Sequence, residues 1–130
     1  MYLLDTNVCI EVLRGNQTID EQLERLDRVR VYTSVITAGE LFYGAARSRQ
    51  PVVETAKVGR LLHDLPVIQL GVKAAMHYGI LKGFLSAKGQ LLEDNDLLIA
   101  AIALSRSLTL VTHDNGFARV PDLQLEDWPA

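Results

Sequence analysis

The sequence predicts an α/β domain built on a mainly parallel sheet of four to five strands, with helices on both faces. Short apolar or alternating runs, typical of strands, recur along the chain, and stretches with helical spacing separate them. Because a helix between two strands usually returns the chain to pair in parallel, this order favours a three-layer α/β/α sandwich. The chain has 130 residues, of which 48% are hydrophobic, so we expect a single domain over residues 1–130.

Two strands and four helices are expected in the first half of the chain. The strands are predicted at 2–4 and 29–33, and the helices at 8–13, 18–26, 35–46 and 51–62. Val29, Val31 and Thr33 alternate with polar or aromatic neighbours, which is the period of a strand. Thr18 followed by Glu21 matches a capping box. The fourth helix opens with a proline, a residue suited to the first helical position.

The second half of the chain continues the alternation. Strands are predicted at 67–70, 108–112 and 123–125, and helices at 72–87 and 95–105. The first of these helices contains Gly79 and Gly83, and Gly89 ends it. The helix at 95–105 is apolar on nearly every side, which predicts that it is buried.

Composition excludes several classes of protein. Charged residues make up only 22% of the chain, so we do not expect the chain to be disordered. The longest apolar run, 97–104, is too short to span a membrane. The N-terminus lacks the basic region of a secretory signal. A single cysteine, Cys9, excludes an intramolecular disulfide and a cysteine-built zinc site, and we expect it in the core. We therefore predict a soluble, cytoplasmic domain with no membrane contact.

The net charge of −3, with a pI of about 5.5, argues against a protein that coats nucleic acid through bulk positive charge. If several carboxylates gather in one metal site, however, the rest of the surface is close to neutral. Mild acidity is therefore compatible with an enzyme that acts on nucleic acid.

Four acids have mostly apolar neighbours. Asp5 ends the first predicted strand, and Asp114 lies just past the strand that ends at residue 112. Glu40 lies in the first turns of the helix after the second strand, and Asp96 begins the apolar helix. Strand ends and the starts of the following helices share one edge of a parallel sheet, and that edge is where open α/β folds bind ligands. We therefore expect these four acids to meet there.

Converging carboxylates repel one another and lose hydration, so such a cluster needs a cation. Oxygen ligands without supporting cysteine or histidine favour Mg²⁺ or Mn²⁺ over Zn²⁺. Such a metal lowers the pKa of bound water and stabilises charge on a phosphoryl oxygen. The expected chemistry is hydrolysis of a phosphodiester, with Asp5, Glu40, Asp96 and Asp114 as both catalytic residues and metal ligands.

Each acid also has an ordinary structural interpretation. Glu40 lies three residues after Thr37 and matches a capping box, while Asp96 suits a helix start and Asp5 and Asp114 suit turns. Taken singly, these interpretations are about as good as the functional one. Four independent coincidences on one edge are less probable, so the set favours a site.

Polar and basic residues near these acids have two interpretations each. Thr6, Asn7, Ser34 and Thr112 are turn or cap types, but their places suit hydrogen bonds that orient metal ligands. A basic stretch is either a solvated helix face or an RNA contact, and it comprises Arg47, Arg49, Lys57 and Arg60. His63, His77 and His113 have no partner at metal-ligand spacing, so surface or packing roles are expected.

Three segments together resemble the PIN-domain ribonucleases: residues 3–7, 34–41 and 95–101. Two more segments, at 110–117 and 125–128, are similar to the VapC toxins of bacterial toxin–antitoxin systems. The matches follow the family order from residue 3 to residue 128. Each motif is weak by itself, but the set is specific.

The resemblance implies an α/β/α fold, Mg²⁺- or Mn²⁺-dependent cleavage of RNA, often tRNA, and a cognate VapB-like antitoxin that inserts a segment into the active site. It also implies a homodimer. The family's acids fall on Asp5, Glu40 and Asp96, and the fourth on Asp114, in a segment one residue shorter than in many relatives. Asp94 ranks below Asp96, because it lies outside the motif and is expected on the preceding loop.

Two other functions remain open from the sequence. A phosphoacceptor receiver domain has a similar length and acids at strand ends, but it needs paired acids after the first strand and a lysine after a late strand. Here Asp5 stands alone, and residues 112–114 offer no lysine. The second alternative is a PIN-like protein that binds RNA or a partner without cutting, and the intact acids argue against it.

Overall fold

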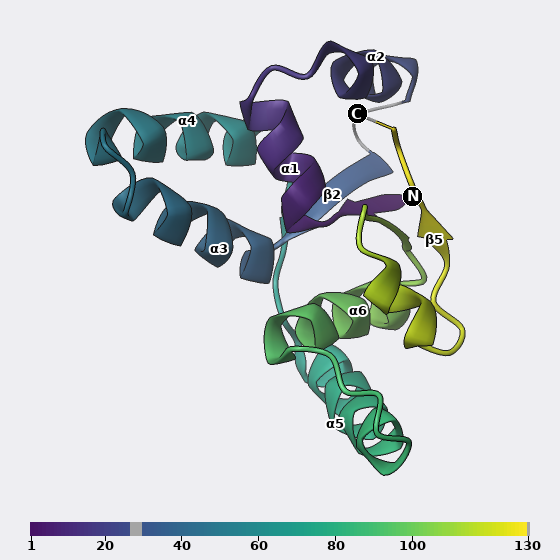
Figure 1. The fold of residues 1–130 in the computed structure, drawn as a ribbon. Helices are drawn as coiled ribbons and strands as arrows, with labels where there is room; N and C mark the ends of the chain where they lie inside the picture. The colour runs from purple at the N-terminus through teal and green to yellow at the C-terminus, as the bar shows by residue number, and fades with distance from the viewer. Residues whose placement is uncertain (27–29, 130) are drawn as a thin grey trace.

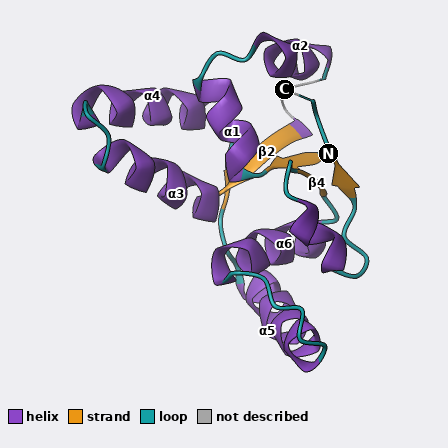
Figure 2. Cartoon of the chain, viewed as in Figure 1, coloured by secondary structure: helices purple, strands orange, loops and turns teal. Residues whose placement is uncertain are grey.

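The computed structural model describes residues 1–26 and 30–129, and it confirms an α/β sandwich around a parallel sheet (Figures 1 and 2). The sheet contains β1 (Tyr2–Leu4), β2 (Val31–Ser34), β3 (Val67–Ile68), β4 (Thr109–Val111) and β5 (Leu125–Glu126). Their spatial order is β3-β2-β1-β4-β5, and all neighbouring pairs are parallel. Because Leu4 is in register with Thr33 and Val111, the carboxyl ends of the three central strands meet at one edge.

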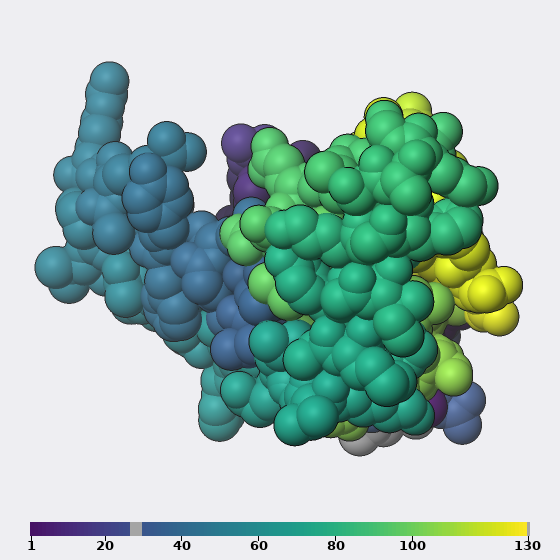
Figure 3. Space-filling view, turned by 90° about the horizontal axis from the view of Figure 1, so that it is seen from below, coloured from purple at the N-terminus to yellow at the C-terminus, as the bar shows by residue number. Residues whose placement is uncertain are grey.

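Helices cover both faces of this sheet. They are α1 (Thr6–Leu13), α2 (Gln17–Arg25), α3 (Val35–Ala46), α4 (Pro51–Asp64), α5 (Val72–Ala87) and α6 (Asp94–Arg106), and a short 3₁₀ helix, η2, spans Asn115–Arg119. Helices α1 to α4 lie on one side, and α5, α6 and η2 lie on the other (Figure 1). Seen from below, α5 spreads across the near face, while the α3–α4 pair projects to the side (Figure 3).

The core divides according to the alternation of side chains along the strands. Leu3 and Leu110 contribute to the apolar cluster under α5 and α6, whereas Leu4 and Val111 contribute to the cluster under α1 to α4. Cys9 is fully buried in the second cluster, as predicted, and burial raises the pKa of its thiol to about 12. Among the described residues, no helix combines the length and the apolar character that a membrane crossing requires.

Several predicted helix starts differ from the structure. The capping box at Thr18 and Glu21 is wrong, because Asn16 caps α2 with its Oδ1, which accepts the Ile19 amide at 3.1 Å. Helix α1 begins at Thr6 and not at residue 8, because Asp5 supplies its cap. The predicted start of the second strand, Val29, lies outside the described residues.

The edge strands are shorter than predicted. β3 covers two residues because its partner β2 gives way to α3 after Ser34, which pairs with Ile68. β5 lies at 125–126, displaced from the predicted 123–125, because residue 122 occupies a turn with a φ of 63°. Helices α4 and α6 are each longer than predicted.

Candidate active site at the carboxyl edge of the sheet

Asp5 is fixed between two neighbouring strands. It follows β1 and caps α1: its Oδ1 accepts the Thr6 amide at 2.8 Å. Its Oδ2 accepts the Thr112 hydroxyl, just past β4, at 2.7 Å. The Asp5 side chain is buried, but it is close enough to Glu40 and Asp114 for their negative charges to raise its pKa. Both oxygens of Asp5 are therefore positioned by the chain itself.

Glu40 is held by a relay of hydroxyl groups. Ser34 caps α3, its Oγ accepting the Thr37 amide at 3.0 Å. The Thr6 hydroxyl donates to Glu40 Oε1 at 2.6 Å and lies 3.0 Å from the Thr37 hydroxyl. Because a hydroxyl has one hydrogen, Thr37 must donate to Thr6. The capping-box interpretation of Glu40 is thus wrong: Ser34 caps this helix, and Glu40 faces Thr6 of α1.

Asp114 is tied to the same network through Thr112. It caps η2, its Oδ1 accepting the Gly116 amide at 2.8 Å, and its own amide donates to Thr112 Oγ1 at 3.0 Å. Asn7 adds two longer contacts, with Thr112 Oγ1 at 3.5 Å and with the His113 amide at 3.4 Å. Of the four polar residues predicted to support the site, Thr6 and Thr112 contact its acids and Asn7 contacts Thr112, whereas Ser34 contacts Thr37.

Asp96 lies in the first turn of α6 and is half-buried. Burial raises the pKa of Asp96 to about 6, and neighbouring carboxylates add to the rise. In order of effect, these neighbours are Asp5, Asp114, Glu40 and Glu93. Burial also raises the pKa of Asp5, against the opposing effect of its hydrogen bonds. These mutual effects place all four predicted acids in one electrostatic neighbourhood.

Two acids near the start of α6 differ from expectation. Glu93, which the sequence reasoning did not single out, occupies the N-cap position of α6 and acts on Asp96 as a fifth negative charge. The position of Glu93, three residues before Asp96 in the sequence, could have indicated that the two acids lie close together. Asp94 is the first residue of α6 and does not lie on the loop. Its Oδ1 accepts Lys82 Nζ at 2.8 Å and the Tyr78 hydroxyl at 2.9 Å, so its pKa is lowered.

The donor chemistry of this edge fits a hard divalent cation. Its acidic side chains offer oxygen ligands, and their mutual repulsion is the cost that a cation relieves. Within residues 1–26 and 30–129, however, no three His, Cys, Asp or Glu side chains already surround a common point. The carboxylates thus form a charged cluster and not a closed ligand shell, and this also excludes a preformed site around His63, His77 or His113.

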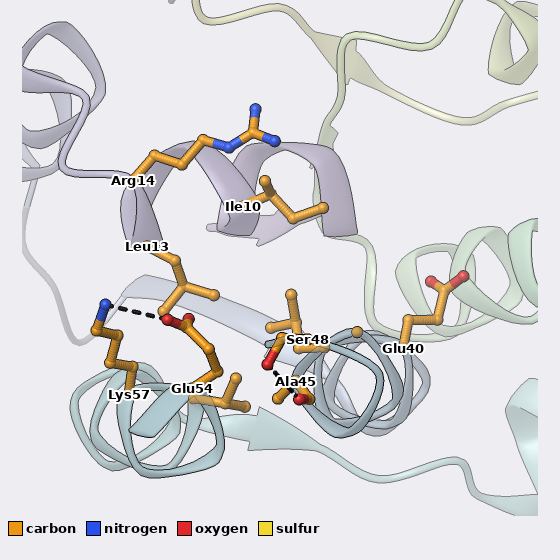
Figure 4. A pocket seen from close by; sticks show the side chains of 11 residues that line it. Ile10, Leu13, Arg14, Glu40, Ala45, Ser48, Glu54 and Lys57 are labelled. Carbon is orange, nitrogen blue, oxygen red and sulfur yellow. Dashed lines mark hydrogen bonds and ion pairs between the residues drawn. The ribbon is translucent and has the colours of Figure 1, made fainter. Parts of the chain in front are cut away.

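Two grooves meet at Glu40. One, of about 710 Å³, is lined by Thr6, Glu40 and Asn95 and by the exposed Tyr43 and Arg47. The other, of about 560 Å³, lies between α1, α3 and α4 (Figure 4). Its walls carry both apolar and charged side chains, namely Ile10, Leu13, Arg14, Glu40, Ser48, Glu54 and Lys57.

The structure separates the four basic residues of the predicted RNA contact. Arg47 lines the first groove, with its guanidinium 5.2 Å from the centre of the Tyr43 ring. Lys57 lines the second groove and lies 3.3 Å from Glu54 (Figure 4). Arg60 lines a different hollow on α4, and Arg49 is exposed in the turn after α3. Two of the four therefore border grooves that reach Glu40.

Parallel strands with acids gathered at their carboxyl edge define a class of α/β proteins. Comparisons with known proteins show which family of that class this chain belongs to. The family model of the PIN domain matches residues 2–123. The chain is 37% identical over 130 residues to "Ribonuclease VapC2" of Haemophilus influenzae, covering 98% of this chain and 97% of the relative. It is 34% identical to the "tRNA(fMet)-specific endonuclease VapC" of Salmonella typhimurium, with the same coverage.

Solved structures agree with these sequence relatives. The VapBC2 complex of Rickettsia felis, bound to a promoter DNA fragment, contains a chain with a TM-score of 0.93 and 33% identity, covering 98% of each chain. DNA-bound VapBC from Salmonella typhimurium gives a TM-score of 0.94 at 35% identity, also covering 98% of each. The chain belongs to the PIN-domain family, within its VapC group. This membership sets aside the receiver-domain alternative.

Proposed function

We propose that this chain is the toxin of a toxin–antitoxin pair and acts as a metal-dependent endoribonuclease. The observation that carries the proposal is the meeting of Asp5, Glu40, Asp96 and Asp114 at one edge of the sheet, where two of them are fixed by threonine hydroxyls. The ribonuclease names of its VapC relatives support the same reaction.

The four acids would hold Mg²⁺ or Mn²⁺, and Glu93 lies close enough to add to their field. Such a cation, when bound, activates water and stabilises negative charge on a phosphoryl oxygen. The chain's own contribution is positional. Thr112 and the Thr6 amide orient Asp5, and the relay from Thr37 through Thr6 orients Glu40. These contacts preset the ligand oxygens before RNA arrives.

RNA would approach along the groove that contains Tyr43 and Arg47. The Tyr43 ring is 67% exposed and has a guanidinium on one face, so the other face is available to stack on an unpaired base. Arg47 and Lys57 would contact phosphates on either side of Glu40. The name of the Salmonella relative makes tRNA the substrate to test.

A VapB-like antitoxin is the proposed partner, since solved relatives are VapBC complexes. An arginine from that partner matches the acidic edge, because a guanidinium pairs with carboxylates in a bidentate way and replaces the charge of a cation. We also propose that the toxin works in the cytoplasm as a homodimer. A purified toxin–antitoxin complex that kept an open acidic edge and full nuclease activity would contradict the plugging model.

The decisive experiment maps RNA 5′ ends after brief induction of the protein, beside an Asp5→Asn control. We expect new ends at a defined position in one or a few RNAs with wild type and none with the control. Purified protein should cut a tRNA pool with Mn²⁺ and stop when EDTA is added. RNA that binds tightly but stays intact under all these conditions would favour the alternative of a non-catalytic RNA-binding or partner-binding module.

A further inference from the structure

One glycine of the chain lies where a side chain would be crowded. The chain has nine glycines, all among the described residues, and a Cβ added to eight of them would meet nothing within 4 Å. A Cβ on Gly116, in η2, would lie 3.2 Å from Asp114 Oδ1 and 3.3 Å from Leu92 Cδ2. The φ angle of Gly116 is not positive, so its backbone does not require glycine. Lack of space therefore explains this glycine.

The space beside Gly116 is filled by the acid and by the loop that joins α5 to α6. The Gly116 amide donates to Asp114 Oδ1 at 2.8 Å, which holds the carboxylate against the turn. Leu92 belongs to the loop, and its Cδ2 lies near the same position. Arg119, at the end of η2, donates to the Leu91 carbonyl at 3.3 Å and ties the short helix to the same loop. The loop thus forms a wall beside Asp114.

Three groups could move to make room for a side chain at position 116, but two of them are held. Leu92 packs against the apolar cluster under α5 and α6. Helix η2 is fixed by Phe117 and Val120, which are buried in that cluster. The Asp114 side chain is exposed, so it is the group that can turn away. Crowding at position 116 would therefore displace the acid.

This displacement matters because one oxygen of Asp114 is already used. Its Oδ1 accepts the Gly116 amide, which leaves Oδ2 as the oxygen that can face a cation. A carboxylate is rigid and planar, so pushing Oδ1 away from the amide also turns Oδ2. Functional side chains need to be held within about 0.5 Å of their productive position. A single added methyl group is thus enough to disturb this acid.

We propose that Gly116 is a positioning residue for Asp114: because it has no side chain, the carboxylate and Leu92 both fit against η2. The proposal rests on the proposed function, since Asp114 is one of the four acids assigned to the cation. Leu92 is the wall, and Gly116 leaves the gap in front of it. Gly116 acts through the direction of the Asp114 carboxylate and not through a contact with RNA.

Gly116→Ala tests the crowding, with Gly59→Ala as the matched control. Gly59 lies on α4, and a Cβ there would meet nothing within 4 Å. In EDTA, Gly59→Ala should raise Tm by about 2–4 °C, because alanine is the better helix former. Gly116→Ala should instead lower Tm by about 2–4 °C, because the added methyl group overpacks the turn. Opposite signs for the same chemical change would locate the crowding at η2.

Two further measurements separate positioning from a general loss of stability: calorimetric titration with Mn²⁺ alone, and steady-state cleavage of RNA. Gly116→Ala should raise the Kd for Mn²⁺ about tenfold and lower kcat similarly, with KM for RNA unchanged. Gly59→Ala should match wild type in all three quantities. A change confined to KM would contradict the proposal, since Gly116 would then act on RNA and not through the acid.

A double-mutant cycle tests the wall. Leu92→Ala removes the methyl group that lies near position 116, while Asp114 keeps its hydrogen bonds to Thr112 and Gly116. In the Leu92→Ala background, Gly116→Ala should raise the Kd for Mn²⁺ less than about threefold. Leu91→Ala is the matched control: the Leu91 side chain is exposed, and in its background the tenfold effect should persist.

The proposal stays testable if Gly116→Ala alone does not fold. The double variant with Leu92→Ala should then fold, because the crowding is relieved, and a double variant that also fails to fold would overturn the proposal. So would a Gly116→Ala that matches Gly59→Ala in Tm and in Kd for Mn²⁺, or an effect of equal size with and without Leu92→Ala. A wild-type chain that neither binds Mn²⁺ nor cuts RNA would contradict the proposed function as well, whereas the other outcomes contradict this proposal alone.

Discussion

The two halves of the acidic edge are built differently. On the side of β1 and α3, Asp5 and Glu40 each accept a hydrogen bond from a threonine hydroxyl. On the side of α6, the Glu93 side chain makes no capping hydrogen bond, and no side-chain hydrogen bond to Asp96 is found among the described residues. Asp5 and Glu40 therefore form the anchored half of the edge. Asp96 and Glu93 form the free half, which is positioned only by helix α6.

This difference in hydrogen bonding affects the pKa values of Asp5 and Asp96 differently. Burial raises the pKa of Asp5, and the hydrogen bonds from the Thr112 hydroxyl and the Thr6 amide oppose that rise. Asp96 has no such compensation, and its pKa rises to about 6. The anchored half thus keeps its geometry as ligands should, whereas the free half is where a cation changes the charge balance most.

The largest expected effect comes from the anchored half. Asp5→Asn keeps the shape of the side chain but removes its charge, so Mn²⁺-dependent cleavage of tRNA should fall at least about a hundredfold. Circular dichroism should show an unchanged fold. Asp94→Asn is the matched control, because Asp94 pairs with Lys82 and is not part of the acidic cluster; it should stay within about twofold of wild type. Equal activities in the two variants would contradict the site.

In the free half, Asp96→Asn should combine a similar loss of cleavage with a gain in stability. The pKa of Asp96 rises from 3.8 to about 6 in the folded chain, so the folded state binds this proton more tightly than the unfolded state. That stabilisation is complete below about pH 4 and is lost as pH rises through about 6. Asp96→Asn carries no charge at this position at any pH, so its stability does not fall in this way as pH rises.

Thermal unfolding in EDTA measures this effect. At pH 7.5 the Tm of Asp96→Asn should exceed that of wild type by about 3–5 °C, and the difference should vanish near pH 4. Ser34→Ala lowers stability by removing a cap, and because Ser34 does not titrate, its deficit should not depend on pH in this way. A constant offset for Asp96→Asn across the range would mean that burial and the neighbouring acids do not raise the pKa of Asp96.

A smaller effect is expected when the anchor of Glu40 is removed. Thr6→Val deletes the hydroxyl that donates to Glu40 while keeping the size of the side chain, so activity should drop about tenfold and stability by about 1 kcal/mol. Thr18→Val, at an exposed position of α2, is the control for the same chemical change. Unchanged activity in Thr6→Val would show that Glu40 needs no anchoring.

The smallest effect concerns RNA binding beside the acids. Tyr43→Ala removes the stacking surface, which should raise KM for a short single-stranded RNA about tenfold and leave kcat nearly unchanged. Phe42→Ala removes a neighbouring exposed aromatic that does not line the groove, and it should behave as wild type. A fall in kcat without a change in KM would instead place Tyr43 among the residues that arrange the reaction.

The sequence allowed much of the fold and the acidic edge to be predicted, because parallel topology brings strand ends and helix starts together wherever they lie along the chain. Asp5, Glu40, Asp96 and Asp114 followed from that rule. Glu93 did not, since its effect depends on where α6 begins.

Local competition and tertiary contacts explain the other differences. Asn16 and Thr18 are both good caps, and the choice depended on whether Gln17 joins the helix.

The hydrogen bond between Thr112 and Asp5 joins residues that are 107 positions apart. The central strand β1 is made early, but its neighbour β4 and the hydroxyl that orients Asp5 come from the last fifth of the described chain. Contacts of this range close slowly during folding, because the loop entropy must be lost before they form. A growing polypeptide therefore lacks the assembled acidic edge until Thr112 has been made, so we expect no RNA cleavage by a nascent chain before β4 has emerged from the ribosome.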